Sequence, residues 1–236
     1  MIRADFQRKI MGGIPMQNAE ILSHIDHTQL KPGCTWQQIQ MLCDEHITYK
    51  TATVCVPPCY IKRIRAAYGQ AVRICTVVGF PLGYMTAAAK AFEAADAVAM
   101  GADEVDMVVN LCDVKDGAFD RVTAEIAAVK QAVGDRVLKV IIETCYLTED
   151  EKIALCRCVT DAGADYIKTS TGFGTAGATL ADVELFKQHI GGNVKIKAAG
   201  GVKTRQDLEA FLAAGCMRIG TSSAVALLTG GEAGGY

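Results

Sequence analysis

Strand-like and helix-like segments alternate eight times between residues 21 and 228, and this alternation limits the possible folds more than any other feature of the sequence. Short runs rich in β-branched and other apolar residues predict strands, and each run is followed by a stretch with helical periodicity. The strands are expected at residues 23–27, 52–56, 73–78, 104–109, 137–142, 164–168, 194–198 and 217–220. Such alternation is typical of βα units that share a parallel sheet.

Helix start and stop signals separate these units. Residues 148–151 read Thr-Glu-Asp-Glu, the pattern of a capping box at a helix N-terminus. Gly101, Gly163 and Gly215 each lie just before a strand, as expected of glycines that end a helix in the left-handed conformation. The helices are expected at residues 35–46, 60–68, 86–100, 119–133, 148–161, 180–190, 204–214 and 222–228.

Eight βα units within about 210 residues predict a single closed (βα)8 barrel, a TIM barrel, as the one domain of chain 1–236. Residues 1–20 are expected to form an N-terminal extension, and the glycine-containing residues 229–236 to form a flexible tail. A doubly wound open sheet is the competing architecture. It normally has fewer strands, and the chain has no visible second domain boundary.

Composition excludes several classes of partner. The formal net charge is -2, so no basic surface for nucleic acid is expected. No apolar run approaches the roughly 20 residues that a membrane helix needs, and residues 1–20 lack the apolar core of a signal peptide. We therefore expect a cytoplasmic protein with no membrane partner, whose ten cysteines are reduced thiols.

Two lysines close strands at the end of the barrel where active sites lie. Lys168 and Lys197 are each followed by small residues. Burial and a second ammonium nearby both lower the pKa of an amine, so Lys168 is expected to be a neutral nucleophile that attacks a carbonyl. The alternative is that both lysines form structural ion pairs with Asp106 and Glu143, a common arrangement. Lys195 shares the strand face of Lys197, so it is expected to extend out of the barrel bottom or to be paired there.

Asp106 lies inside the apolar strand 104–109, where a carboxylate needs a cation or hydrogen-bond donors. Its functional role would be to carry protons beside the lysines, and its structural role would be that of a counter-ion. The two roles are compatible.

Small residues follow the last two strands in a pattern that resembles the phosphate site of barrel enzymes. Gly200 and Gly201 follow the seventh strand, while Gly220, Ser222 and Ser223 lie at the end of the eighth, where a helix begins. Backbone N–H groups and the start of that helix would hold a dianion. The alternative is ordinary turn glycines and a helix-capping serine.

Residues 172–177 read Gly-Phe-Gly-Thr-Ala-Gly and match the dinucleotide fingerprint, but the next strand ends without an acidic residue for a ribose. We interpret the match as a glycine-rich turn and expect no cofactor. The four histidines form no metal-ligand pattern, and no metal site is expected.

Seven motifs together resemble the 2-deoxy-D-ribose-5-phosphate aldolase family, whose members are class I, Schiff-base aldolases. They occur in order along most of the chain: Ile25-Asp26-His27-Thr28, Gly79-Phe80-Pro81-Leu82-Gly83, residues 101–110, Ile141-Ile142-Glu143-Thr144, residues 168–173, residues 197–202 and residues 218–223. The combination is specific, whereas any one motif alone would not be.

The resemblance implies a metal-free TIM-barrel enzyme that reversibly cleaves 2-deoxyribose 5-phosphate to acetaldehyde and glyceraldehyde 3-phosphate. On this pattern Lys168 forms the Schiff base, Lys197 perturbs Lys168 and takes part in proton transfer, and Asp106 activates a water or carries protons. The family's C-terminal tyrosine, which helps to move the proton at the donor carbon, corresponds to Tyr236.

The resemblance also bears on the supporting residues. Phosphate or substrate binding is expected at Gly172 and at the glycines and serines after the last two strands. Supporting positions are expected at Asp26, Glu143 and Thr171, and a homodimer is compatible with the sequence. The chain departs from the family pattern at Ala199, Lys203 and Pro57. The second departure would weaken phosphate contact, because lysine lacks the bidentate fork of arginine.

Three other functions remain open at this point. The chain could be another Schiff-base phosphosugar aldolase or transaldolase, or a phosphosugar-binding barrel without catalysis. The glycine run would correspond to a nicotinamide dehydrogenase, which we do not expect.

Overall fold

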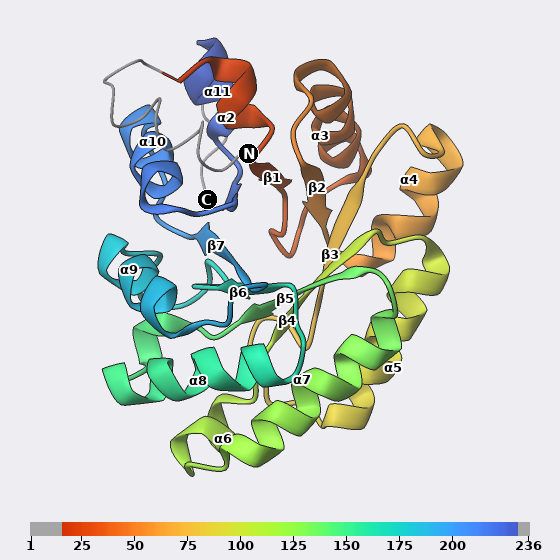
Figure 1. Cartoon of the computed structure of the whole chain (residues 1–236). Helices are drawn as coiled ribbons and strands as arrows, with labels where there is room; N and C mark the ends of the chain where they lie inside the picture. Colours follow the sequence, from red (N-terminus) through yellow and green to blue (C-terminus); the bar gives the residue numbers. More distant parts are fainter. Residues whose placement is uncertain (1–15, 231–236) are drawn as a thin grey trace.

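The computed structural model describes residues 16–230 and places eight parallel strands in a closed barrel, in chain order, with β8 paired back to β1. Figure 1 shows the strands at the centre of a ring of helices. The predicted (βα)8 barrel is therefore confirmed. The strands are β1 (Ile25–Thr28), β2 (Thr53–Val56), β3 (Ile74–Val78), β4 (Glu104–Val108), β5 (Val137–Ile141), β6 (Tyr166–Lys168), β7 (Lys195–Ala199) and β8 (Arg218–Thr221).

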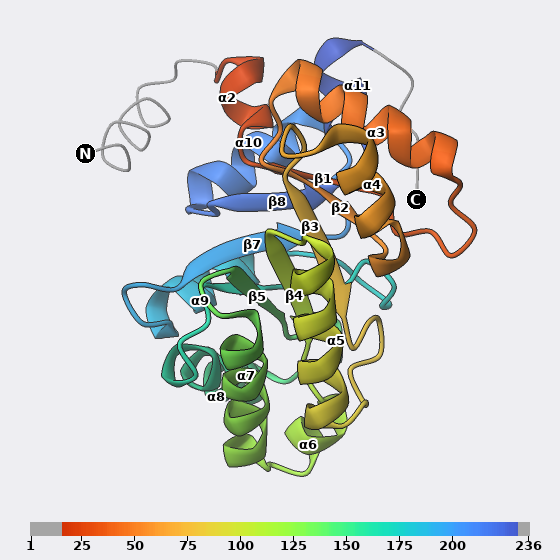
Figure 2. The ribbon, with the colours of Figure 1, turned by 90° about the vertical axis from the view of Figure 1, so that its right-hand side faces the viewer.

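The main helices lie outside the strands, as Figure 2 also shows from a second direction. They are α3 (Trp36–Tyr49), α4 (Ile61–Tyr68), α5 (Ala87–Met100), α7 (Phe119–Val133), α8 (Glu149–Asp161), α9 (Leu180–His189), α10 (Arg205–Ala214) and α11 (Ala224–Thr229). All eight predicted helices are present; α7 has the predicted bounds, and the ends of the other seven are shifted by one to three residues at one or both ends. The capping box expected at the start of α8 is present at Thr148 and Glu151.

Three short elements were not expected from the sequence: η1 (Pro58–Tyr60), α6 (Leu111–Lys115) and η2 (Thr144–Tyr146). The start of α6 has a local cause, because the Asn110 side chain accepts a hydrogen bond from the Cys112 amide at 3.1 Å. These elements follow β2, β4 and β5, so they lie at the end of the barrel where the strands terminate.

Part of the predicted N-terminal extension forms α2 (Asn18–Leu22), which buries Ile21 and Leu22. The Asn18 side-chain amide donates to the Leu228 carbonyl of α11 at 2.6 Å, and Arg205 of α10 donates to the Asn18 side chain at 2.6 Å. Helix α2 is thus attached to α10 and α11. Residues 1–15 of the predicted extension and residues 231–236 of the predicted tail lie outside the described residues.

Successive side chains along a strand point alternately toward the helices and into the barrel, so the molecule has two buried regions of different character. On β4, Val105 and Met107 belong to the apolar core between strands and helices, whereas Glu104 and Asp106 alternate with them and pair with charged groups of other strands. In register, Asp106 lies opposite Lys139 of β5. Strand pairing therefore brings charged residues from distant parts of the chain to one level inside the barrel.

Lys195 begins β7 and is exposed, with its Nζ 5.4 Å from the centroid of the Tyr166 ring. The expectation that it would extend out of the barrel bottom is confirmed. None of the helices within residues 16–230 combines the length and the apolarity needed to cross a bilayer.

Candidate active site

Seven charged side chains are buried inside the barrel and form one connected cluster, which we call the ionic core. Each is less than 10% exposed, and they come from six of the eight strands: Asp26, Glu104, Asp106, Lys139, Lys168, Lys197 and Arg218. Burying so many charges is costly unless each has a partner of opposite sign. The contacts among them therefore decide what this interior can do.

Asp106 is the centre of the ionic core, because its carboxylate contacts three lysines. Its Oδ1 lies 2.9 Å from Lys139 Nζ, and its Oδ2 lies 2.8 Å from Lys168 Nζ and 2.6 Å from Lys197 Nζ. The three residues that the sequence placed together, Asp106, Lys168 and Lys197, are indeed in contact. The structural alternative was correct that Asp106 pairs with the lysines, and this pairing is compatible with a catalytic role.

Two further carboxylates, Asp26 and Glu104, pair with the other basic groups of the ionic core. Asp26 forms ion pairs with Lys197 and, at 2.5 Å, with Arg218 Nη1. Glu104 lies 2.6 Å from Lys139 Nζ and 2.9 Å from Arg218 Nη1. Lys197 and Arg218 are thereby held between two acidic groups each. Asp26, which was predicted to support the site, forms an ion pair that holds Lys197 in place.

The ionic core changes the pKa values of its members. Burial by itself would raise the pKa of Asp106 and of Asp26, but the surrounding cations outweigh burial and hold both pKa values well below the usual range. Burial by itself would lower the pKa of Lys139 and of Lys197, but the carboxylates outweigh it and raise both. These four groups are therefore charged at neutral pH.

The ionic core contains three carboxylates and four basic groups, so it has one more basic group than acidic groups. Among the described residues, Lys168 is the base with the fewest acidic contacts, since its Nζ pairs with Asp106 alone and shares that oxygen with Lys197. Lys139, by comparison, contacts Asp26, Glu104 and Asp106. Lys168 is thus the member whose positive charge is least compensated.

A cavity of about 390 Å³ opens onto Lys168 at the C-terminal end of the strands. All the residues expected to bind phosphate line it together with Lys168, namely Gly172, Gly200, Gly201, Gly220, Ser222 and Ser223. Lys203, one of the departures from the family pattern, also lines it, so this wall keeps a positive charge. The cavity therefore has an amine at its floor and small residues on its walls.

The loops around this cavity are packed closely at glycines. Gly200 and Gly201 have φ of 78° and 75°, in the left-handed region that favours glycine. A Cβ on Gly177 would lie only 2.3 Å from the Gly200 carbonyl. The glycines of residues 172–177 thus allow the loop after β6 to contact the loop after β7, which agrees with our interpretation of the fingerprint match as a turn.

Glu143 and Thr171 form a second polar group beside the cavity. The Glu143 carboxylate accepts hydrogen bonds from the Thr171 amide at 3.2 Å and from the Thr171 hydroxyl. Burial raises the pKa of Glu143, and its backbone is in the left-handed region with φ of 53°. Within residues 16–230 it forms no ion pair, so the predicted pairing of Glu143 with a lysine is wrong; its carboxylate positions the loop that carries Thr171 and Gly172.

Donor groups for a metal ion coincide with the ionic core. The ligand atoms of Cys55, Cys75 and Asp106 lie within 4.8 Å of one another, as do those of Asp26, Cys75 and Glu104. The carboxylates of both groups already contact lysine or arginine, which occupy the position that a cation would take. The geometry therefore fits a lysine-centred site better than a metal site.

Sequence reasoning missed Lys139, Glu104, Arg218 and Cys75. The signal that identified Lys168, a lysine within an apolar strand, was also present for Lys139 in Val-Leu-Lys-Val-Ile. Arg218 and Glu104 are the first residues of β8 and β4, and a charged residue at the start of a strand is usually expected to be exposed to solvent. Tyr236 lies outside the described residues.

Comparisons with known proteins agree with this geometry. Residues 20–229 match the sequence profile of the DeoC/LacD family aldolases. The chain belongs to the DeoC/LacD aldolase family. A deoxyribose-phosphate aldolase of Clostridium botulinum (strain Eklund 17B / Type B) is 64% identical over 94% of this chain and 100% of the relative. One from Clostridioides difficile (strain 630) is 57% identical over 88% and 95%. The chain is therefore an aldolase.

Solved structures of related aldolases share the fold. An aldolase named QR15 superimposes with a TM-score of 0.85 at 36% identity, covering 89% of this chain and 95% of its own. The deoxyribose phosphate aldolase of Aeropyrum pernix, described as tetrameric, gives a TM-score of 0.84 at 29% identity, with 96% of each chain covered.

The pKa shifts of the ionic core predict how its stability depends on pH. Asp26 and Asp106 have lowered pKa values, so their contribution is present above the unfolded value of about 3.9 and is lost as pH falls below it. Lys139 and Lys197 have raised pKa values, so their contribution is present below about 10.4 and is lost as pH rises above it.

Lys139→Met should therefore lower the free energy of unfolding by about 3–5 kcal/mol at pH 7, because it leaves buried carboxylates short of a cation. The deficit should shrink near pH 3.5, where the carboxylates of the variant take up protons. Urea unfolding at constant ionic strength measures both values. Lys130→Met, which removes a partly exposed ion pair with Asp165, is the control and should cost about 1 kcal/mol or less. An equal deficit for Lys139→Met at both pH values would contradict the analysis.

Proposed function

We propose that this aldolase reversibly cleaves 2-deoxy-D-ribose 5-phosphate to acetaldehyde and D-glyceraldehyde 3-phosphate through a Schiff base on Lys168. The observation that carries the proposal is the position of the Lys168 amine, which is 3% exposed, lines the cavity and contacts a carboxylate shared with a second lysine. The names of the relatives support this substrate.

The contacts within the ionic core support Lys168 as the nucleophile. Lys139 and Lys197 each have an acidic partner besides Asp106, whereas Lys168 contacts Asp106 alone among the described residues. Of these three lysines, Lys168 is the one that lines the cavity. A lysine amine in that position can attack the carbonyl carbon of a substrate and form a Schiff base.

The reaction then follows from an amine and an aldehyde. The Lys168 nitrogen adds to C1 of the open-chain sugar, and loss of water gives an iminium ion. The C2–C3 bond breaks with its electron pair moving toward the iminium, while the C3 hydroxyl loses its proton and becomes the aldehyde of glyceraldehyde 3-phosphate. The enamine that remains on Lys168 is protonated at C2, and water releases acetaldehyde.

Asp106 and Lys197 are the groups placed to move protons in these steps. Asp106 Oδ2 contacts both amines, so it can orient a water or pass a proton between that water and Lys168. Asp106 and Asp26 raise the pKa of Lys197, so its ammonium stays charged beside Lys168 and can donate a proton to a bound oxygen.

Borohydride trapping tests the nucleophile. Incubation with acetaldehyde and sodium borohydride should reduce the iminium to an N-ethyl group, and peptide mapping should find it on Lys168. Lys139 and Lys197, buried in the same ionic core, serve as internal controls and should be unmodified. Lys168→Met should abolish both the adduct and cleavage. A label on Lys197 or Lys203 would overturn the assignment, and binding of substrate without any reducible adduct would favour a non-catalytic barrel.

A condensation assay with glyceraldehyde 3-phosphate as acceptor separates the proposal from the other Schiff-base aldolases. Acetaldehyde should be accepted as donor, whereas dihydroxyacetone should give little condensation with glyceraldehyde 3-phosphate. The opposite preference would point to a transaldolase-type substrate.

The phosphate position is proposed on the wall formed by Gly200, Gly201, Gly220, Ser222 and Ser223, which lines the same cavity as Lys168. Binding there would orient the substrate so that C1 reaches Lys168.

Ser222→Asp places a negative charge on this wall and tests it. Repulsion should raise KM for 2-deoxyribose 5-phosphate by roughly tenfold or more, while kcat/KM for unphosphorylated 2-deoxyribose should change little. Ser222→Asn has a similar shape without the charge and is the control. Equal losses with both substrates would place the phosphate elsewhere.

Tyr236 is proposed to move the proton at the donor carbon. The resemblance of the chain to the family is the basis for this role, because Tyr236 itself lies outside the described residues. Tyr236→Phe should slow exchange of the acetaldehyde methyl protons with solvent deuterium, measured by NMR, without lowering the thermal unfolding midpoint. Unchanged exchange would remove Tyr236 from the mechanism.

The expected homodimer and the expected cytoplasmic location stay predictions of the sequence.

A further inference from the structure

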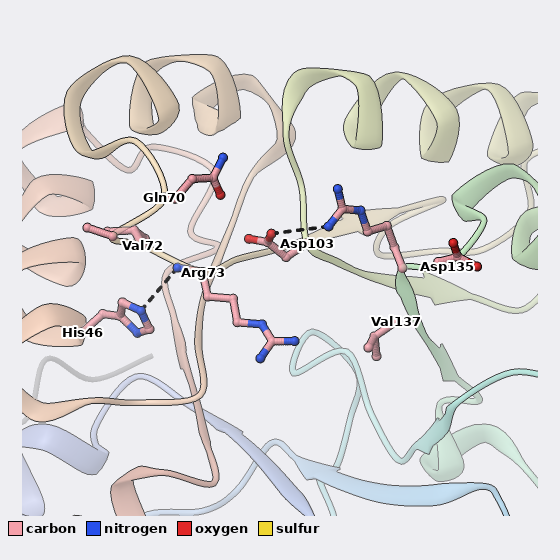
Figure 3. A pocket seen from close by; sticks show the side chains of 9 residues that line it. His46, Gln70, Val72, Arg73, Asp103, Asp135 and Val137 are labelled. Carbon is pink, nitrogen blue, oxygen red and sulfur yellow. Dashed lines mark hydrogen bonds and ion pairs between the residues drawn. The ribbon is translucent and has the colours of Figure 1, made fainter.

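A second cavity, of about 380 Å³, lies at the opposite end of the barrel from Lys168. It is bounded by the residues that enter β3, β4 and β5 and by His46 of α3; the polar residues lining it include His46, Gln70, Arg73, Asp103 and Arg136. Figure 3 shows the Arg73 side chain extending between His46 and Val137. The aldolase reaction proposed above makes no use of this cavity.

Two guanidinium groups in this cavity have acidic neighbours only at long range. Arg73 Nη2 lies 3.5 Å from Glu104 Oε1, and Arg136 Nη1 lies 3.8 Å from Asp103 Oδ1. Neither side chain donates a hydrogen bond to another of the described residues, and they are 58% and 52% exposed. A guanidinium presents five N–H donors, so both retain donors for a ligand.

The acidic groups near these two arginines have stronger partners elsewhere. Asp103 is paired with Arg65, and its carboxylate also accepts from the Ile74 amide at 2.7 Å. Glu104 is bound by Lys139 and Arg218 inside the barrel. The charged residues that line the cavity itself are two arginines and two aspartates, and the second aspartate, Asp135, is exposed to solvent.

His46 adds no charge at neutral pH but fixes the position of Arg73. Burial lowers the pKa of His46 to about 4, so the ring is neutral. Its Nε2 accepts a hydrogen bond from the Arg73 amide at 3.3 Å, and its Nδ1 is bonded to the Thr51 hydroxyl at 2.8 Å. The backbone from which Arg73 extends is therefore held in place at the edge of the cavity.

We propose that this cavity is a binding site for a small dianion, a phosphate group or a dicarboxylate, held by Arg73 and Arg136. Planar guanidinium groups form paired hydrogen bonds with both kinds of oxyanion, and such charge-assisted bonds are about twice as strong as neutral ones. The site is separate from the phosphate position proposed above and does not depend on the proposed reaction.

Binding is measured by isothermal titration calorimetry with inorganic phosphate in one series and malonate in the other, at ionic strength held constant with sodium chloride. The protein carries Ser222→Asp, which opposes anion binding at the catalytic cavity; if that cavity binds no phosphate, the substitution is harmless to the test. We expect one saturable site per chain, and the tighter of the two anions identifies the ligand class.

Arg73→Gln and Arg136→Gln in this background should each weaken binding by roughly tenfold or more. Arg121→Gln, which changes an exposed arginine paired with Asp113 on α6, is the matched control and should leave the Kd unchanged. If Arg73→Gln proves unstable because Glu104 loses a neighbour, Arg136→Gln alone decides, since Arg136 makes only one long-range pair. Absence of saturable binding by either anion, or an unchanged Kd in Arg136→Gln, would overturn the proposal.

Discussion

The contact of one carboxylate with three lysines is the interaction on which the rest of the site depends. Asp106 places the amines of Lys139, Lys168 and Lys197 around a single buried group. Ammonium groups this close would repel one another strongly in a water-poor interior without that carboxylate. Asp26 contacts Lys139 and Lys197, and Glu104 contacts Lys139, but neither acid contacts Lys168. Lys168, the proposed nucleophile, is thus the lysine of the ionic core with the fewest acidic contacts among the described residues.

The two ends of the barrel differ in how their residues are arranged. At the C-terminal end, glycines after β6, β7 and β8 leave a cavity with little side-chain bulk above Lys168. At the N-terminal end, the centroid of the Tyr166 ring lies 5.6 Å from the guanidinium of Arg218, a member of the ionic core, and 5.4 Å from Lys195 Nζ. The cavity that Lys168 lines is at the end where the strands terminate, which is where the active sites of such barrels lie.

Much of the fold could be predicted because local patterns carry it. Alternating apolar strands and capped helices indicated eight βα units. Parity along β7 placed Lys195 on the strand face of Lys197 and predicted that Lys195 would either extend out of the barrel bottom or be paired there; the structure shows it exposed. The partners could not be predicted in the same way. Whether Lys139 lies opposite Asp106, and whether Arg218 reaches both Asp26 and Glu104, depends on strand register and barrel closure, which join residues far apart in sequence. The left-handed backbone of Glu143 and the short helix α6 likewise have no strong sequence signal.

The distribution of the buried charges along the chain has a consequence for assembly. The three carboxylates of the ionic core all come from β1 and β4, in the first half of the chain, whereas all four basic groups come from β5 to β8. A barrel completed by two copies of the first half would enclose only anions, and one completed by two copies of the second half only cations. The buried charges therefore have partners of opposite sign only when the first half of the barrel closes with the second half.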